Sequence, residues 1–295
     1  GKRVRMVNRS GQATVPAGVE IVSANATDPA HTRAVTAGAA VVYQAAQPRY
    51  HEWVEKFPPI QAGVLAGAAA NGAKLVVGEN LYMYGPIHGP ITEDLPYAPT
   101  TRKGRIRAEM SEALMDAHAK GQVQVAIGRA SDFFGPGVCD SAVGERVFYP
   151  ALAGKRVLAL GDLDAPHTYT FIDDFGKTLV TLGERDEALG QAWHTPSAPT
   201  LTTRRFLKLV FEEAGYPAKI GAKVGDFEVL DAASLTDLIK QNRIKIAMIA
   251  VPAAQAQEVA DQLVRAGVKA ILNYAPTSLT VPDGVRVQYV DPVTH

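Results

Sequence analysis

The sequence predicts a doubly wound α/β fold, in which helices cover both faces of a parallel sheet. Short β-branched runs alternate with Ala-rich helical stretches along the chain. The runs lack polar alternation, which is typical of strands buried on both faces. Glycine follows several of the helical stretches, where a left-handed cap is needed.

The elements follow in a regular order. Strands are expected at Arg3–Asn8, Glu20–Ala24, Ala40–Tyr43, Lys74–Val77, Val123–Ile127, Arg156–Leu160, Lys245–Ala250, Val268–Leu272 and Val285–Val290. Helices are expected at Ile60–Ala70, Arg107–Lys120, Arg204–Ala214 and Ala254–Ala266. Asp173 and Asp174 are expected to cap a further helix that begins near Phe175. The stretch Ser131–Pro150, rich in Phe, Gly and Pro, predicts an irregular loop, and a change of character near Tyr216–Lys219 predicts a domain junction there.

Composition excludes several classes of protein. The 295 residues carry 30 Lys+Arg and 30 Asp+Glu, so the formal net charge is zero and no nucleic-acid partner is expected for this chain alone. A single cysteine, Cys139, excludes an internal disulfide and is expected to be an inert thiol. No apolar run approaches the roughly 20 residues of a membrane helix, so we expect a cytoplasmic protein. The histidines are scattered without an i, i+4 pair, and no metal site is predicted.

A doubly wound fold that binds a dinucleotide usually carries Gly-x-Gly-x-x-Gly in its first strand-to-helix turn, where the backbone approaches the pyrophosphate. That motif is not in the sequence, and Gly135-Pro136-Gly137 is no substitute because Pro lacks the N–H that a phosphate cradle needs. Two explanations stay open: the chain binds no dinucleotide in the ordinary way, or the first strand and its glycine-rich loop lie upstream of Gly1. We favour the second.

Several segments resemble, in family order, the extended or atypical short-chain dehydrogenase/reductases, the NAD-dependent epimerase/dehydratase group. They are Val4–Ser10, Asn25–Asp28, Val41–Ala46, Tyr84–Pro86, Thr92–Asp94, Phe133–Gly137 and Thr170–Asp174. The resemblance covers residues 2 to about 218 and begins at the family's second strand. It implies a Rossmann-like domain over 1–218 that binds NADP or NAD and acts on a small or sugar-like substrate.

The same resemblance implies residues of the cofactor site. Arg9 would face a 2′-phosphate and thus favours NADP, and Asn25 lies in the loop beside the adenine, where Asp is usual. The small residues Ala45 and Ala46, together with Gln47, follow the strand that packs under the cofactor.

The catalytic set implied by the resemblance is not retained. Asn80 stands where the family has Ser or Thr, Thr101 where it has Tyr, and Arg105 where it has Lys. A Thr hydroxyl has too high a pKa to be the acid/base, and an Arg keeps the charge but donates no proton near neutrality. Replacement groups are expected among aromatic and imidazole side chains near the substrate end: Tyr82, Tyr84, His88, Tyr97 and His167. For each of them the ordinary role is favoured over contact with substrate: packing of the loop for the tyrosines and a plain surface position for the histidines.

The remainder of the chain, residues 219–295, resembles a different family. Lys219–Gly221, Phe227–Val229, Ile246–Pro252, Ala256–Asp261, Gly267–Pro276 and Val281-Pro282 are similar to the C-terminal half of the NADH-sensing domain of Rex redox-sensing repressors. This resemblance implies that Pro252, Asn273 and Tyr274 line the nicotinamide end of bound NADH. The winged-helix DNA-binding domain of that family is not part of the pattern. A natural fusion, a hybrid and an incorrectly assembled sequence all stay open as its origin.

Two functions therefore compete. The first is an NAD(P)-dependent oxidoreductase or epimerase with atypical catalytic groups, acting on a small molecule. The alternative is a non-catalytic NAD(H)-binding redox-sensor module. A third possibility, an assembly module alone, has no feature in its favour. Both resemblances imply a homodimer.

Overall fold

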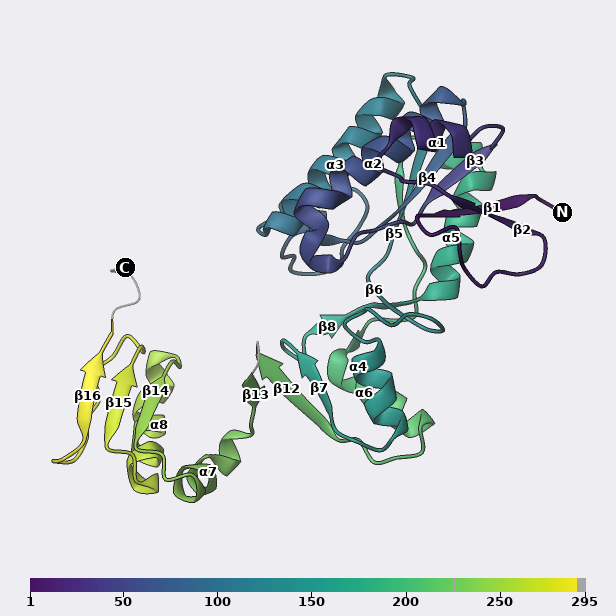
Figure 1. Ribbon diagram of the computed structural model, residues 1–295. Coiled ribbons are helices and arrows are strands. Elements are labelled where there is room, and N and C mark those ends of the chain that lie inside the picture. Colours follow the sequence, from purple (N-terminus) through teal and green to yellow (C-terminus); the bar gives the residue numbers. More distant parts are fainter. Residues whose placement is uncertain (225–226, 291–295) are drawn as a thin grey trace. The chain divides into compact units, whose positions relative to one another are not determined.

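The computed structural model describes residues 1–224 and 227–290, with the side chains of 222–224 excluded. The chain divides into two compact units, Gly1–Ile220 and Gly221–His295 (Figure 1). Each unit is an α/β structure with parallel strands, as the alternating pattern predicts.

The centre of the first unit is a four-stranded sheet in the order β10-β5-β4-β3, all parallel. The strands are β3 (Val41–Gln44), β4 (Lys74–Glu79), β5 (Val125–Arg129) and β10 (Ala192–His194). Strands β4 and β5 are almost wholly buried because side chains leave both of their faces into apolar layers. The predicted doubly wound fold is confirmed by these layers.

Helices on opposite faces supply the two layers. Helices α2 (Trp53–Ala70) and α3 (Arg102–Ala119) cover one face, where Leu75 and Ile127 pack with Leu114. Helix α5 (Ile172–Glu184) covers the other, where Val76 packs with Leu179 and Leu182. Alternate residues of β4 thus enter different layers, as the two-residue period of a strand requires.

A smaller parallel pair precedes this sheet. Strand β1 (Val4–Asn8) pairs with β2 (Val19–Ser23), and helix α1 (Pro29–Val35) then leads to β3. Asp28 caps α1, since its carboxylate accepts from the backbone N–H of Ala30 at 2.8 Å. The turns after β1, β2 and β3 carry the residues expected to hold the cofactor.

The rest of the first unit is built from short strands and two helices. They are β6 (Asp132–Phe134), α4 (Glu145–Leu152), β7 (Val157–Leu160), β8 (Pro166–His167), β9 (Tyr169–Phe171), β11 (Leu201–Thr202) and α6 (Thr203–Glu213). Strand β6 pairs in parallel with β9, and β8 pairs antiparallel with β11. Figure 1 shows β6 and β8 between the central sheet and helices α4 and α6.

Four sequence-based expectations need correction. Helix α3 begins at Arg102, five residues before the predicted start, because Thr101 caps it there. Residues 131–150 are not all irregular: β6 forms there, and α4 begins at Glu145 because Val147 and Ala151 give it a buried face. Helix α2 begins at Trp53, seven residues before the predicted start, and holds Pro58 and Pro59 within it. Helix α5 begins at Ile172, so the two aspartates at 173 and 174 lie in its first turn and do not cap it. Acidic groups there still favour the positive end of the helix dipole.

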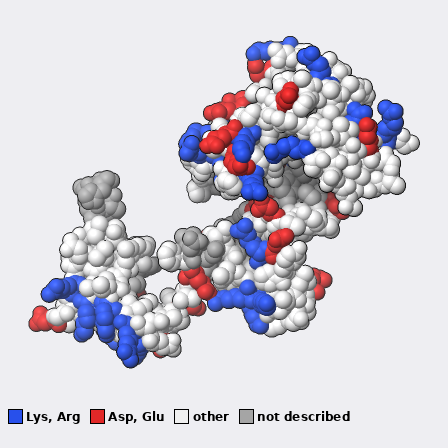
Figure 2. All heavy atoms as spheres, in the orientation of Figure 1, with Lys and Arg blue, Asp and Glu red and all other residues white. Residues whose placement is uncertain are grey.

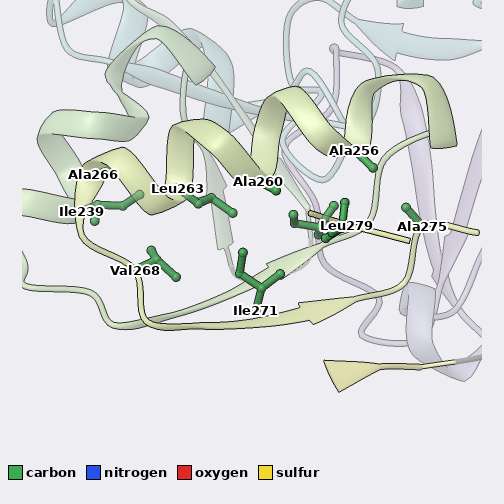
Figure 3. Packing of buried hydrophobic residues seen from close by; sticks show 10 residues of the cluster. Ile239, Ala256, Ala260, Leu263, Ala266, Val268, Ile271, Ala275 and Leu279 are labelled. Atoms are coloured by element: carbon green, nitrogen blue, oxygen red, sulfur yellow. The ribbon is translucent and has the colours of Figure 1, made fainter. Parts of the chain in front are cut away.

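The second unit is a three-stranded parallel sheet in the order β14-β15-β16. Its elements are β14 (Ile246–Ile249), β15 (Ala270–Asn273), β16 (Arg286–Tyr289), α7 (Leu235–Gln241) and α8 (Ala253–Ala266). An antiparallel hairpin, β12 (Ile220–Val224) and β13 (Phe227–Val229), begins at the boundary between the units. Figure 3 shows Ala256, Ala260 and Leu263 on the face of α8 that points toward the strands, with Ala260 above Ile271 and Ala256 near Leu279; these residues belong to the core of this unit. Gly267 ends α8 with φ +107°, as its position in the sequence predicts.

Candidate functional site

The candidate site lies at the carboxyl ends of β4 and β5, where open α/β sheets bind ligands. Strand β4 leads into a short 3₁₀ turn, η2 (Tyr82–Tyr84), and β5 leads into β6. Two groups of polar side chains lie at this end of the sheet. One is buried around Arg129, and the other is partly exposed around Asp132.

Arg129, the last residue of β5, is the centre of the buried group. Its Nε donates to Glu79 Oε2 at 3.1 Å, Nη1 donates to the Tyr84 hydroxyl at 2.6 Å, and Nη2 donates to Ser111 Oγ at 2.7 Å. Nη2 also donates to the hydroxyl of Tyr97, which is 3.0 Å from Ser111 Oγ. We call Glu79, Tyr84, Tyr97, Arg107, Ser111 and Arg129 the Arg129 network.

The Arg129 network holds two guanidinium groups against one carboxylate. Arg107 Nη2 lies 3.5 Å from Glu79 Oε1, and the three side chains are at most 2% exposed. Burial lowers the pKa of Arg107. Burial alone would also lower the pKa of Arg129, yet Glu79 and Tyr97 stabilise its charge and raise it above the ordinary value. Both guanidinium groups therefore depend on one buried carboxylate.

Tyr84 belongs to this network and is fully buried. Its hydroxyl lies 3.0 Å from His194 Nε2 at the end of β10. Burial raises the pKa of Tyr84 although Arg129 opposes the shift, and burial lowers the pKa of His194. A neutral phenol and a neutral imidazole are thus favoured, and the Tyr84 side chain fixes the turn after β4 to the sheet.

The other predicted catalytic residues lie directly after β4, at the start of helix α3 or in the loop between them. Thr101 is the N-cap of α3, because its hydroxyl accepts from the Gly104 N–H at 3.0 Å. Arg105 Nη1 donates to the Thr100 carbonyl at 3.3 Å, and Asn80 Oδ1 accepts from the Tyr82 N–H at 3.2 Å. His88 is exposed.

The partly exposed group contains His167 and Asp132. His167 Nε2 lies 2.9 Å from Asp132 Oδ2, with the side chains 39% and 35% exposed. The ring of Tyr169 lies 4.8 Å from the His167 ring, centroid to centroid. Burial, then the hydrogen bond to Tyr50 and the charge of Asp132, raise the pKa of Tyr82. The spacing of 35 residues between Asp132 and His167 gives no signal of this pair in the sequence.

The predicted cofactor residues of the first unit lie on successive turns after parallel strands. Arg9 follows β1, Asn25 follows β2, and Ala45, Ala46 and Gln47 follow β3, all exposed. The side chain of Asn25 shapes its own turn, since Oδ1 accepts from the Thr27 N–H at 3.2 Å. Gln44, which ends β3, is hydrogen-bonded to both backbone groups of Ala46, at 2.9 and 3.1 Å.

In the second unit, the predicted residues lie at the carboxyl ends of β14 and β15. Pro252 precedes α8, and the Tyr274 N–H donates to the Ile249 carbonyl at 2.8 Å. Asn273 is 1% exposed, and its amide makes three hydrogen bonds to the following loop, with Ala275 twice and with Thr277. The buried Asn273 side chain therefore fixes the conformation of that loop.

Two further features concern the described residues: the thiol of Cys139 and the spacing of side chains that can bind metal ions. Cys139 is exposed, and a hydrogen bond with Glu145 raises the pKa of its thiol, which favours the neutral form. Within residues 1–224 and 227–290, no three His, Cys, Asp or Glu side chains form a group that could hold a metal ion. In that same part of the chain, every helix is too short or too polar to cross a membrane.

The C-terminal part is similar to redox-sensing transcriptional repressors named Rex. The repressor of Chloroflexus aurantiacus is 57% identical over 77 residues, which are 26% of this chain and 36% of that repressor. The repressor of Carboxydothermus hydrogenoformans is 55% identical over 73 residues, 25% of this chain and 35% of that repressor. The chain thus spans about a third of the length of these relatives. The profile of a CoA binding domain matches residues 211–277.

Solved structures share the fold of the first unit. An epimerase from Methanothermobacter thermautotrophicus superposes with a TM-score of 0.67 at 18% identity, covering 76% of this chain and 73% of that one. A dTDP-glucose 4,6-dehydratase from Streptomyces venezuelae, solved with NAD bound, gives a TM-score of 0.63 at 17% identity, covering 75% and 73%. UDP-N-acetylglucosamine 4-epimerase from Bacillus cereus gives 0.65 at 12% identity, covering 80% of each chain.

The sequence profile of the NAD dependent epimerase/dehydratase family matches residues 1–194, about two thirds of the chain. The matched residues include both polar groups at the carboxyl ends of β4 and β5. The parallel sheet, the segments in family order and this profile agree: the chain belongs to the NAD dependent epimerase/dehydratase family.

Proposed function

We propose that residues 1–218 bind NAD or NADP and transfer hydride to or from a small or sugar-like substrate. The observation that carries this proposal is the placement of Arg9, Asn25 and residues 45–47 on the exposed turns after β1, β2 and β3. A nucleotide laid across the carboxyl ends of these strands would contact all three turns. The named neighbours that act on sugar nucleotides support the substrate class.

The residues on these turns fit the adenosine half of the cofactor. The Arg9 side chain is exposed, and the turn after it is held from inside by Asn8 Oδ1, which accepts from the Gly11 N–H at 2.7 Å. Arg9 would hold a 2′-phosphate, Asn25 would lie beside the adenine, and Ala45 and Ala46 would leave room for the nucleotide. When bound, the nicotinamide supplies hydride transfer. No hydrogen bond within the described residues uses the Arg9 guanidinium, so it is available for such an anion.

Replacing Arg9 tests the choice of cofactor. For Arg9→Ala we expect NADPH to bind about tenfold or more weakly, since one charge-assisted contact to the 2′-phosphate is lost. NADH affinity should stay within about twofold, because NADH has no such phosphate. Fluorescence titration of the full chain with each nucleotide measures both changes, and the matched control is Arg3→Ala, since Arg3 lies just before β1, at its other end. Equal weakening of NADH and NADPH would contradict the role of Arg9.

The alternative is a non-catalytic NADH-binding sensor module, supported by the identity of residues in the second unit to Rex repressors. We infer in that case that Pro252 and Tyr274 contact the nicotinamide, while Asn273 positions their loop. NADH binding without turnover, weakened by Tyr274→Ala, would favour this alternative. Figure 2 shows acidic and basic side chains interspersed over the visible face of the first unit, and a group of basic side chains along the lower edge of the second unit. DNA binding by this chain alone is not part of either proposal, because its net charge is zero. A cytoplasmic homodimer is proposed from family resemblance.

A further inference from the structure

Asn80, Thr101 and Arg105 stand at the positions of the family's catalytic residues. Their hydrogen bonds give them structural roles. Thr101 caps α3, Arg105 contacts a backbone carbonyl, and Asn80 holds the turn after β4. The Tyr84 hydroxyl is enclosed between Arg129 and His194, and burial raises its pKa. A proton-transfer group must therefore come from elsewhere at the substrate end if the proposed function holds.

Asp132 and His167 provide such a group. Asp132 is the first residue of β6, just beyond the carboxyl end of β5, and His167 is in β8. The Asp132 carboxylate can only accept, so the 2.9 Å contact places a proton on His167 Nε2, and the lone pair of the neutral ring is then on Nδ1. Within the described part of the chain, Nδ1 of His167 has no hydrogen-bond partner, and the side chain is 39% exposed. An oriented imidazole with a free lone pair is the arrangement of a general base held by a carboxylate.

Paired strands and an aromatic ring fix the positions of Asp132 and His167. Strand pairing holds both residues: Asp132 is in register with Tyr169, and His167 with Leu201. The Tyr169 ring lies against the imidazole at 4.8 Å and is itself fixed, because its hydroxyl donates to Thr203 Oγ1 at 2.8 Å. The pair is thus held by four short strands, β6, β8, β9 and β11, and by one buried aromatic ring. A surface ion pair between two flexible side chains would lack this support.

We propose that His167 is the acid/base of the reaction and that Asp132 is its positioning residue. This inference rests on the proposed function. In the oxidative direction the O–H bond of a substrate hydroxyl breaks and its proton forms an N–H bond at Nδ1. The electron pair left on oxygen forms the C=O bond as the carbon's hydride leaves to the nicotinamide of NAD(P)⁺. In the reductive direction the imidazolium returns the proton to the carbonyl oxygen.

The first test is the protonation of the His167 ring, which needs no substrate. Long-range ¹H–¹⁵N correlation spectra of the full chain at about pH 8 report which ring nitrogen carries the proton, above the ordinary histidine pKa of about 6.5. The His167 signals are those missing from the His167→Gln spectrum. We expect the Nε2–H form in the wild type and a loss of that preference in Asp132→Asn. The Nδ1–H form in the wild type would overturn the proposal.

The second test is turnover of UDP-glucose, UDP-galactose and dTDP-glucose with NAD⁺ and NADP⁺. We expect His167→Gln to lower kcat about 100-fold or more with a small change in KM, and Asp132→Asn to lower it less. The matched control is His31→Gln, since His31 also lies beside a carboxylate, 3.8 Å from Asp28, but on α1.

The outcomes separate the two proposals. A kcat of His167→Gln within about threefold of the wild type overturns the acid/base role, as does a wild type that binds NADH yet converts none of the sugars. If the wild type binds neither NADH nor NADPH, the proposed function fails, and the ring protonation alone then decides whether Asp132 orients His167.

Discussion

Glu79→Gln is expected to destabilise the first unit by about 3–5 kcal/mol, the largest effect of any single change at the site. The carboxylate is fully buried and faces two guanidinium groups, Arg107 and Arg129, that are almost fully buried themselves. An amide of the same shape leaves both positive charges without a counter-charge in a poorly solvated place. Urea unfolding followed by circular dichroism measures the loss as a lower midpoint.

The control for this variant is a carboxylate in an exposed ion pair. Glu184 pairs with Lys2, and the two side chains are 48% and 73% exposed. Glu184→Gln should therefore leave the urea midpoint close to that of the wild type. Equal midpoints for Glu79→Gln and Glu184→Gln would show that the Arg129 network does not depend on its carboxylate.

Gly63→Ala is the second change with a large expected effect, a loss of about 2–3 kcal/mol. Gly63 lies within α2, and a Cβ there would be 2.0 Å from the carbonyl oxygen of Ala26 and 3.3 Å from Cα of Thr27. Both neighbours are backbone atoms, so the loop or the helix must shift. The loop that would shift is the turn of Asn25, and weaker NADH binding is expected with the loss of stability.

Substitution of a second helical glycine is expected to raise the stability of the protein. Gly176 lies within α5, and a Cβ there would meet no atom within 4 Å. Gly176→Ala should therefore stabilise the protein by up to about 1 kcal/mol, since alanine is the better helix former. Thermal unfolding of both variants beside the wild type measures the two shifts, and a stabilised Gly63→Ala would contradict the packing of α2 on that loop.

Local patterns predict the apolar strands β3, β4 and β5 of the central sheet but not its edge strand β10. Strands β4 and β5 are apolar throughout because both faces are covered, and this leaves a signal in consecutive residues. The glycine caps are equally local, as at Gly267 after α8. The start of α2 is not evident in the sequence, because prolines such as Pro58 and Pro59 are unfavourable inside a helix; packing of Trp53 and Phe57 nevertheless extends the helix through them.

The polar groups at the site could not be predicted in the same way. Glu79 and Arg129 are 50 residues apart and meet only because β4 and β5 are neighbours in register. Tyr84 has the sequence context of a substrate contact but is buried by Arg129, a partner that nothing near it in the sequence indicates. The exposed cofactor turns lie after successive strands, where the family resemblance expects them, yet their contacts with a nucleotide stay a prediction.

The central claim is that the first unit binds a nicotinamide dinucleotide at the carboxyl ends of its strands. Fluorescence titration of the full chain with NADH and NADPH tests it most directly. Saturable binding of at least one nucleotide, with NADPH lost preferentially in Arg9→Ala, is the predicted result. No saturable binding of either nucleotide by a folded wild-type chain would contradict it.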